Sequence, residues 1–536
     1  MPPRSRRPEQ MATFELVPDD EREDADGPLG PEGEEKAGPT LRERAATRWR
    51  RLSRRGRVLV ATGSAVVVLA AATAAVAPGL LDARDQRLRA EAVQGLPGVV
   101  GDLSEPLTNT WEVPVGDDGT FVMLSGGVLV TTDGTEAVAT SVANGGALWR
   151  QEVGATPTCG PDPGFSTGWA DPPDLAVCLG GEPGRRAATV LDSAGQVLGT
   201  RELGEVNDPM VQWSSHAPTV WPGPDGTLAV VEDAPLVTVP AAEDRTAGET
   251  LRALRDAGWR DPTLRVQDVA TGDLVAGATA RLRASDVAGC GTFQEDGHAE
   301  PQVQPFPYLD TSSTRSVLHV CNVAVGITAD GDVLDLTSTD GASQPLPGGG
   351  SVVLGESSRF LDAAGAEIVT VPGWAVPPTI DDDGGAFISV VPGAGSDLEH
   401  ATLVATSRGG ERLWSRPSDG FSVVAARLAG TVVVADAHGI VGLDADTGSV
   451  RWDAGELVDV APDGTGDQVV GAVTDGTRVL LGIGGENRPH RLIALDARDG
   501  GVAWQQEVSG ALGRLVAADG HPVVVSASWQ SVRGFG

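Results

Sequence analysis

Two stretches near the C-terminus decide the fold: "GIVGLDADTGSVRW", residues 439–452, and "RLIALDARDGGVAW", residues 491–504. Each consists of a hydrophobic run, an aspartate, a glycine and a second run with a tryptophan four positions after the glycine. Short apolar runs separated by an acidic turn that contains glycine predict two antiparallel strands. We call this unit the repeat motif.

The polar residues of the repeat motif have the properties of turn residues. The aspartate ends a strand, where its short side chain accepts hydrogen bonds from the following backbone N–H groups, and the glycine supplies a positive φ. Strand alternation predicts that the tryptophan lies on the same face as the valine two residues before it. We expect a packing role, rather than ligand binding, for the two complete motifs, which consist of Asp444, Gly448 and Trp452, and of Asp496, Gly500 and Trp504.

Weaker copies of the motif recur along the chain. Two copies keep the glycine and the tryptophan without the aspartate, and they comprise Gly145 with Trp149 and Gly410 with Trp414. Four more have lost the tryptophan, around Gly195, Gly272, Gly331 and Gly365. The spacing between successive glycines averages close to 50 residues. That spacing is typical of a β-propeller, in which each blade has four short strands.

The two ends of the repeat region complement each other. Residues 511–536 supply three strands and no fourth, whereas "NTWEVPVG", residues 109–116, reads as a single strand that carries Trp111. We therefore expect the first strand to complete the last blade, which closes the ring and removes its free edges.

The repeat motif resembles the A-x-D-x-x-T-G-x-x-x-W docking motif of PQQ-like, or quinoprotein-type, β-propellers, over about residues 108–536. The resemblance implies an all-β, eight-bladed propeller in which each tryptophan packs against the neighbouring blade. Eight motifs and the closing blade make nine, one more than the family usually has. The short step of 34 residues from Gly331 to Gly365 predicts a merged copy there, so we expect eight blades.

The 536-residue chain carries its net charge of −34 unevenly. Up to Arg57 there are 13 basic and 12 acidic residues, and the remainder has 27 basic and 62 acidic residues, a net charge of −35. Nucleic acids and anionic lipids both reward clusters of Lys and Arg. The acidic remainder therefore disfavours both as partners.

An N-terminal part differs in composition from the repeats. Residues 1–57 predict a disordered cytoplasmic tail that ends in a basic juxtamembrane segment. Residues 58–81, from Val58 to Leu81, have no charged side chain and are long enough to span a bilayer as a helix. Residues 82–107 predict a stalk or linker, and residues 108–536 the propeller. The arginines before the span are Arg42, Arg44, Arg48, Arg50, Arg51, Arg54, Arg55 and Arg57.

The arginine cluster predicts the orientation of the span. By the positive-inside rule its N-terminal end is cytoplasmic, so we expect a single-pass, type II protein of the cell membrane with its C-terminal domain outside the cytoplasm. The alternative is a cleaved signal peptide with Ala75-Val76-Ala77 as the cleavage site, but the apolar run is long for one.

The four cysteines all follow the apolar segment, where oxidation is possible. Cys159 and Cys178 are 19 residues apart, and Cys290 and Cys321 are 31 apart. Neither spacing is that of a zinc site. Three pairings are possible, and we expect the two local disulfides.

Evidence for catalysis is weak in the sequence. Proteins of the resembled quinoprotein dehydrogenase class have a calcium-bound quinone and a vicinal cysteine pair, and many have a C-x-x-C-H haem segment. The sequence contains neither adjacent cysteines nor a C-x-x-C-H segment. His216 and His298 read as exposed loop residues, and the run Asp381 to Asp383 as a solvated turn rather than a cation site. We expect no cofactor and no metal.

Two long excursions are the places for individual functions. One contains "TAGETLRALRDAGWRDP", which predicts a small helix with Leu251, Leu254 and Trp259 on a docking face, and the other, between Cys290 and Cys321, carries Phe306 and the only tyrosine, Tyr308. We expect a non-catalytic scaffold that binds a protein or an envelope ligand. The alternatives are an extracytoplasmic enzyme, either a degenerate quinoprotein oxidoreductase or a hydrolase, and a single-pass sensor.

Overall fold

The structure is a computed structural model that divides into two units, residues 1–81 and residues 82–536. It describes residues 88, 91, 93, 96 and 98–536, with gaps at 116–119, 162–171, 183, 208–217, 234, 242–244, 294–301, 339–342, 347–349, 379, 381–384, 394–399, 419–422, 437–438, 459–465 and 486–488. The predicted tail and the predicted membrane span lie outside the described residues. Among the residues described, no helix is long and apolar enough to cross a bilayer.

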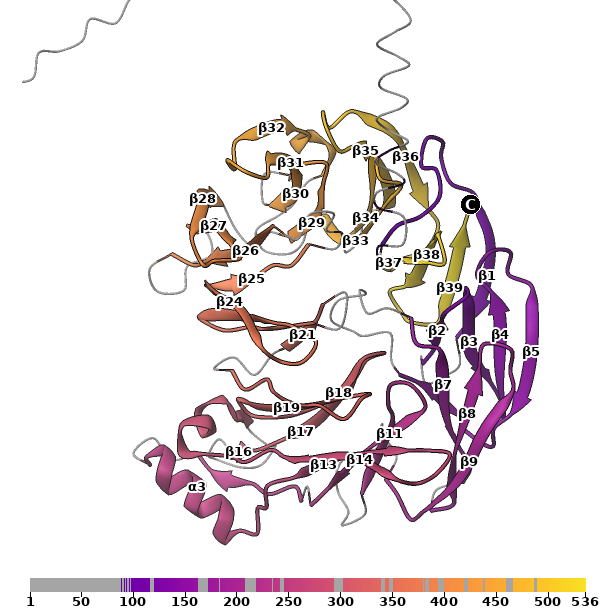
Figure 1. Ribbon diagram of the computed structural model, residues 1–536, viewed down its shortest axis with the longest axis vertical. Helices are drawn as coiled ribbons and strands as arrows, with labels where there is room; N and C mark the ends of the chain where they lie inside the picture. The colour runs from indigo at the N-terminus through magenta and orange to yellow at the C-terminus, as the bar shows by residue number, and fades with distance from the viewer. Residues whose placement is uncertain are drawn as a thin grey trace, which may run out of the picture. The chain divides into compact units, whose positions relative to one another are not determined.

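The second unit is a β-propeller, as predicted, and its four-stranded antiparallel sheets follow one another in chain order (Figure 1). Blade 1 comprises β2 (Val122–Leu124), β3 (Val128–Asp133), β4 (Glu136–Ser141) and β5 (Ala147–Glu152). Blade 2 comprises β6 (Thr158–Gly160), β7 (Leu175–Gly180), β8 (Arg186–Asp192) and β9 (Val197–Gly204). Blade 3 comprises β10 (Thr219–Pro222), β11 (Thr227–Glu232), β13 (Thr263–Asp268) and β14 (Leu274–Thr279).

The next three blades include the shortest strands. Blade 4 comprises β17 (Pro307–Thr311), β18 (Arg315–Val320), β19 (Val323–Thr328) and β20 (Val333–Asp335). Blade 5 comprises β21 (Ser343–Pro345), β22 (Ser351–Val353), β23 (Ser357–Leu361) and β24 (Glu367–Pro372). Blade 6 comprises β25 (Trp374–Ala375), β26 (Ala386–Val391), β27 (Ala401–Ser407) and β28 (Arg412–Ser418).

The last three blades contain the complete repeat motifs. Blade 7 comprises β29 (Val423–Leu428), β30 (Thr431–Asp436), β31 (Gly439–Asp444) and β32 (Val450–Asp453). Blade 8 comprises β33 (Gln468–Thr474), β34 (Arg478–Gly484), β35 (His490–Asp496) and β36 (Val502–Val508). Blade 9 comprises β37 (Leu512–Ala518), β38 (His521–Ser526) and β39 (Ser531–Phe535), and its fourth strand is β1 (Asn109–Pro114).

The described residues thus form nine blades, and the predicted number of eight was wrong. Gly331 and Gly365 lie in two separate blades, in the turns before β20 and β24. No copy is merged there, because blade 5 is built from strands of only 3 to 6 residues and fits into the short step. Eight motifs and the closing strand gave the correct number of nine, whereas the short step of 34 residues and the usual size of the resembled family favoured eight.

The core consists of separate clusters, each of which joins two successive blades. Blades 1 and 2 share one such cluster, and so on along the chain to blades 8 and 9. A further cluster joins blade 9 to blade 1, with Trp111 and Val532 packed on Phe121 and Leu129. The antiparallel pairing of β1 with β39 also brings the two ends of the propeller together, so the ring is closed as predicted.

The segment before β1 takes part in this closure. Val100, Leu103 and Leu107 are buried in the cluster between blades 8 and 9. The backbone N–H of Val100 donates to Thr474 O, and the N–H of Gly101 donates to Gly520 O. Part of the predicted linker is therefore packed against the last two blades.

The excursion after β11 forms the predicted helix, α3 (Ala247–Asp256), and it begins with a capping box between Thr246 and Glu249. β12 (Val239–Pro240), β16 (Gln302–Gln304) and β15 (Gly291–Phe293) form a small additional sheet beside it. Leu254 and Trp259 are buried in the cluster shared by blades 3 and 4. The apolar face of α3 is therefore covered by the chain itself.

Candidate functional site

The tryptophans of the repeat motif join each blade to the segment that follows it around the ring. Each indole Nε1 donates a hydrogen bond to a backbone carbonyl, and all five tryptophans are largely buried apart from Trp149, which is partly buried. The pairs are Trp111 with Val142 O at 2.7 Å, Trp149 with Ser193 O at 3.0 Å, Trp414 with Ala445 O at 2.8 Å, Trp452 with Ala497 O at 3.1 Å, and Trp504 with Leu103 O at 2.8 Å.

The motif glycines receive these rings. Gly448 has a φ of 67°, and a methyl group added to it would lie 2.6 Å from the Trp414 ring of the preceding blade. Gly195 has a φ of 80° and the same relation to Trp149. The glycine therefore serves both the turn and the approach of the neighbouring indole. The interface between blades 8 and 9 has no such turn. There Trp504 Nε1 donates to the carbonyl of Leu103, in the segment before β1.

A β-bulge before the docking position was not foreseen from the sequence. Gly442 pairs with Trp452 and Leu443 with Val450, so Arg451 is an extra residue in β32. Eight of the nine blades have this one-residue shift. The expected alternation is therefore wrong: Trp452 is buried, whereas Val450 is 53% exposed.

Blade 4 lacks the bulge, and its docking residue moves accordingly. β19 pairs with β20 without a shift, from Val325 with Asp335 to Ile327 with Val333. Leu334, three positions after Gly331 instead of four, is the residue that approaches Gly365 of the next blade.

The residue opposite the docking position varies in size with the docking residue. Where the fourth strand carries tryptophan, its cross-strand partner is small: Ala139, Ala405, Gly442, Ala494 or Gly534. In three blades without tryptophan the partner is larger, with Val190 opposite Gly199, Val266 opposite Ala276 and Phe360 opposite Val369. In these blades a large docking residue thus faces a small cross-strand partner, and a smaller docking residue faces a larger partner.

The motif aspartates are used within their own turns. Asp444 Oδ1 accepts hydrogen bonds from the backbone N–H groups of Asp446 and Thr447. Arg451, the bulge residue, donates two bonds to Asp444 Oδ2, at 3.0 and 2.7 Å. The Arg451 guanidinium and the Thr447 hydroxyl lower the pKa of Asp444 to about 2. Both carboxylate oxygens of Asp444 are therefore engaged within its own turn and strand.

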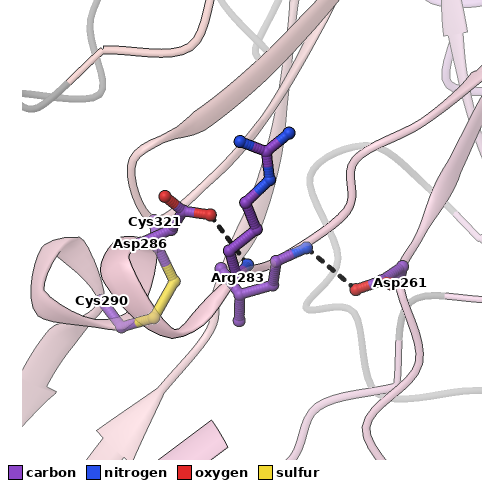
Figure 2. The surroundings of a disulfide bond; sticks show 6 residues. Asp261, Arg283, Asp286, Cys290 and Cys321 are labelled. Atoms are coloured by element: carbon purple, nitrogen blue, oxygen red, sulfur yellow. Dashed lines mark hydrogen bonds between the residues drawn. A yellow bond between two sulfur atoms is a disulfide. The ribbon is translucent and has the colours of Figure 1, made fainter. Parts of the chain in front are cut away.

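Both predicted disulfides are present. Cys159 and Cys178 are a directly opposed pair on β6 and β7, within blade 2. Cys290 ends the 3-10 helix η1 (Ala284–Gly289), and it bonds to Cys321 in the turn between β18 and β19 (Figure 2). The second disulfide therefore connects the segment that follows blade 3 to blade 4.

The hydrogen bonds around the second disulfide hold η1 in place. Asp286 Oδ2 accepts the backbone N–H of Arg283 at 2.8 Å, and Asp261 Oδ1 accepts the backbone N–H of Leu282 at 3.1 Å (Figure 2). Asp261 also pairs with Arg255 of α3 at 2.7 Å. α3, η1 and the hairpin turn of blade 4 are thereby connected to one another.

The strongest candidate for a binding surface is a row of three side chains at β17, formed by Tyr308 and Asp310 on the strand and by Phe306 directly before it. We call it the β17 row. The segment between Cys290 and Cys321 is not one long loop, because it contains β15 to β18. Phe306 is 47% and Tyr308 45% exposed, and after residue 100 the other exposed large apolar side chains of the described residues are aliphatic and lie on fourth strands. The row is thus distinct from them in both chemistry and position.

β17 lies at the inner edge of blade 4. It pairs with β18 at one end of its sheet, and the first strands of neighbouring blades contact each other, as β10 contacts β6 and β17. Alternation places Phe306, Tyr308 and Asp310 on one side of the strand, while Pro307, Leu309 and Thr311 are buried on the other.

Tyr308 rests on a buried histidine. Its ring is stacked on that of His319, with the centroids 4.4 Å apart and the planes 1° from parallel, and His319 is 2% exposed. Burial, and then the charge of Asp310, raise the pKa of Tyr308 above its ordinary value, so the phenol is neutral.

Asp310 and Arg315 are charged groups close to the interface of blades 4 and 5. Arg315 is 2% exposed, and its Nη1 donates to Gly350 O at 3.1 Å and to the Ser351 hydroxyl, both in or next to blade 5. Burial lowers the pKa of Arg315 to about 10, with Asp310 opposing the change. Burial raises the pKa of Asp310, and Arg315 opposes that change.

The other residues that the sequence singles out concern catalysis and metal binding. His216, His298 and the run Asp381 to Asp383 lie outside the described residues. In the described part of the chain, no three His, Cys, Asp or Glu side chains are placed to share a metal ion. All four cysteines are in disulfides between distant residues, so they do not fit the vicinal pair of a quinoprotein dehydrogenase.

Residues 437–535 match the protein family described as "Outer membrane protein assembly factor BamB". The match begins just before β31 and ends at the last residue of β39, so it covers parts of blades 7 and 9 and all of blade 8, and it includes both complete motifs. This segment consists of PQQ-like propeller repeats. The four degraded copies of the repeat motif and the two copies that keep glycine and tryptophan lie outside the matched segment.

Three solved structures with similar folds span most of the chain. BamB from Moraxella catarrhalis is 14% identical, covering 80% of this chain and 99% of its own, with a TM-score of 0.36. Quinohemoprotein alcohol dehydrogenase from Comamonas testosteroni is 12% identical, with coverages of 80% and 76% and a TM-score of 0.33. Saccharomyces cerevisiae Sqt1 is 9% identical, with coverages of 82% and 99% and a TM-score of 0.33. No curated protein sequence matches the chain.

The sequence pointed to Phe306 and Tyr308 but not to the features that make them a surface. Their alternation with Pro307 and Leu309 is the signal that β17 is a strand. That signal is short and lies within a polar, proline-containing stretch, which favours a loop. The stack on His319 depends on strand register, which the sequence does not display.

Proposed function

We propose that the chain is a membrane-anchored, extracytoplasmic scaffold that binds a partner protein and catalyses no reaction. The observation that carries the proposal is the β17 row, which exposes two aromatic side chains at the start of an inner edge strand of a rigid, closed ring. Exposed aromatic side chains on a rigid support are typical anchors in protein interfaces. The repeat residues, by contrast, are engaged in packing between blades.

The compartment is inferred from covalent chemistry and from the N-terminal sequence. Two disulfides are typical of a protein that folds outside the cytoplasm. The uncharged segment Val58–Leu81, with its preceding arginines, supplies the anchor in this proposal. The family that matches residues 437–535 is described as an assembly factor, which favours a role in envelope protein assembly by analogy.

Site-specific crosslinking tests partner binding. A photoreactive phenylalanine at position 306 of the full chain, irradiated in native membranes, should capture a specific protein. The control carries the same group at Val450, which is 53% exposed on the fourth strand of blade 7. Products that are identical at both positions, or absent at 306, would contradict a partner at the β17 row.

A cofactor experiment tests the non-catalytic part of the proposal. The purified full chain is incubated with PQQ and calcium, and both cofactor retention and dye reduction are measured. We expect neither. Stoichiometric retention of the quinone together with turnover would favour the quinoprotein oxidoreductase instead.

Cysteine labelling in intact cells tests the topology. A membrane-impermeant maleimide should label the chain only after an impermeant reductant has opened the two disulfides. Labelling that requires cell lysis would place the propeller in the cytoplasm and overturn the proposed location.

A further inference from the structure

The β17 row combines the two groups that recognise an organic cation. Tyr308 has one ring face on His319, so the stack fixes the ring and leaves its other side to solvent. The face of an aromatic ring attracts a cation, most strongly where the ring is held in place. Phe306, two residues earlier and directly before the strand, is a second exposed ring on the same side.

The carboxylate of the row is available to a ligand. The Asp310 side chain makes no hydrogen bond or ion pair with another described residue, whereas Asp444 accepts two hydrogen bonds from Arg451. Arg315, the nearby cation, directs its guanidinium to the Gly350 carbonyl and the Ser351 hydroxyl. Asp310 is therefore a partly buried acidic group on the same side of the strand as the two rings, and its charged neighbour Arg315 directs its hydrogen bonds to blade 5.

The charge of the domain favours the same kind of ligand. After Arg57 the chain carries a net charge of −35, which raises the local concentration of cations and speeds their association. An open row along an edge strand suits a side chain that is presented by another protein, whereas a small free molecule usually needs an enclosed pocket.

We propose that the β17 row binds an arginine or lysine side chain of the partner protein, with the cation over Tyr308 and Phe306 and paired with Asp310. The inference rests on the proposed function because it supplies the chemistry of that partner. An uncharged saccharide, or an apolar side chain, is the competing occupant of a flat aromatic surface.

The single tyrosine makes the site directly observable. Full-length protein labelled with 3-fluorotyrosine has one fluorine reporter, at Tyr308. Its ¹⁹F resonance is followed during titration with N-acetyl-arginine amide and with N-acetyl-citrulline amide, which has nearly the same shape and no charge. We expect a saturable shift with the arginine probe and roughly tenfold weaker binding of the citrulline probe.

Two variants separate the contributions of the row. Asp310→Asn should weaken binding of the arginine probe roughly fivefold or more, and Phe306→Leu should weaken it severalfold while keeping the reporter. Asp330→Asn removes the same charge from the exposed turn before β20 in the same blade, and it should leave the affinity unchanged. A circular dichroism spectrum and a thermal unfolding midpoint close to those of the parent check that each variant is folded.

The outcomes distinguish this inference from the proposed function. Equal affinities for the arginine and citrulline probes would overturn the cation site. So would a response to N-acetylglucosamine alone, or no response to any probe. If crosslinking at position 306 still captures a partner, the scaffold proposal survives that failure. If the arginine probe binds as expected but no partner is captured, the cation site stands and the scaffold proposal fails.

Discussion

In blades 6 to 9 and in blade 1 a tryptophan fills the docking position, whereas in blades 2 to 5 that position carries Gly199, Ala276, Leu334 or Val369. We call the first set the tryptophan arc and the second the disulfide arc, because both disulfides lie in the second set. The two arcs are each contiguous. One ring thus holds its blades together by two different means.

The disulfide arc compensates for the missing indoles in several ways. The larger residues Val190, Val266 and Phe360 fill volume from the opposite strand. Cys290–Cys321 adds a covalent link between the segment after blade 3 and blade 4, and the buried Arg315 bonds blade 4 to blade 5. The excursion with α3 and the β17 row also lie in this arc. The blades without a docking tryptophan are therefore the ones that carry the features specific to this propeller.

The largest expected effect is the loss of a docking indole. Trp452→Ala should lower the free energy of unfolding by about 3–5 kcal/mol, because it leaves a cavity between blades 7 and 8 and removes the bond to Ala497 O. Chemical denaturation followed by circular dichroism measures the loss. Val369→Ala, at the same position in the disulfide arc, should cost less because a smaller side chain is removed.

Val450→Ala is the matched control for that variant. Val450 lies two residues earlier on β32 and is 53% exposed, so its truncation should change stability by less than about 0.5 kcal/mol. Equal losses for Trp452→Ala and Val450→Ala would show that the indole does not secure the interface.

Removal of the second disulfide should have the next largest effect. The double variant Cys290→Ser/Cys321→Ser should lose about 2–4 kcal/mol, because the unfolded chain gains freedom over a 31-residue separation. Hydrogen exchange should rise in blades 3 and 4 and stay unchanged in β30 to β35, which belong to the tryptophan arc.

The first disulfide provides the comparison. Cys159→Ser/Cys178→Ser opens a link within blade 2, across a 19-residue separation. Its stability loss should be similar or slightly smaller, and the faster exchange should be confined to blade 2. Uniformly faster exchange around the ring in either variant would mean that the arcs do not differ in local stability.

A third test addresses the exchange of volume across the strand pair. Gly442 faces Trp452, and a Cβ at this position would overlap the indole. Gly442→Ala should therefore destabilise the protein by about 1–3 kcal/mol through overpacking. In the Trp452→Ala background the same substitution should cost little or become stabilising. A double-mutant cycle with additive effects would rule out the size coupling.

Much of this arrangement could be predicted from the sequence. All eight motif glycines, including those of the four degraded copies, lie in turns with a positive φ between 67° and 92°. The closing role of Trp111 followed from counting strands at the two ends. These features depend on local turn chemistry and on the composition of single strands, which the sequence displays directly.

The parts that could not be predicted depend on register. A bulge such as that at Arg451 adds one residue to one strand, and period-two alternation then assigns the wrong face to Val450. The stack of Tyr308 on His319 also results from pairing between strands. The residue two positions before the motif aspartate, or its equivalent, is alanine or glycine in every blade with a docking tryptophan, but Gly326 of blade 4 faces Leu334, so this signal alone does not predict the tryptophan.

The smallest expected effect concerns the turn of a tryptophan-arc blade and its dependence on pH. Asp444 has a pKa of about 2 in the folded protein, below its ordinary value of 3.8, because Arg451 and Thr447 stabilise the carboxylate. A lowered pKa in the folded state means that the stabilisation is fully present above about pH 4 and is lost as the pH falls towards 2.

Asp444→Asn removes this charge while keeping the shape of the side chain. The variant should be less stable than the parent by no more than about 1 kcal/mol at neutral pH, because the ion pair is partly exposed to solvent. The difference should shrink steadily between about pH 4 and pH 2, as measured by denaturant titrations at several pH values. A difference that stayed constant over that range would contradict a contribution from the charge pair with Arg451. It would instead assign the effect to hydrogen bonds of the turn that asparagine does not make.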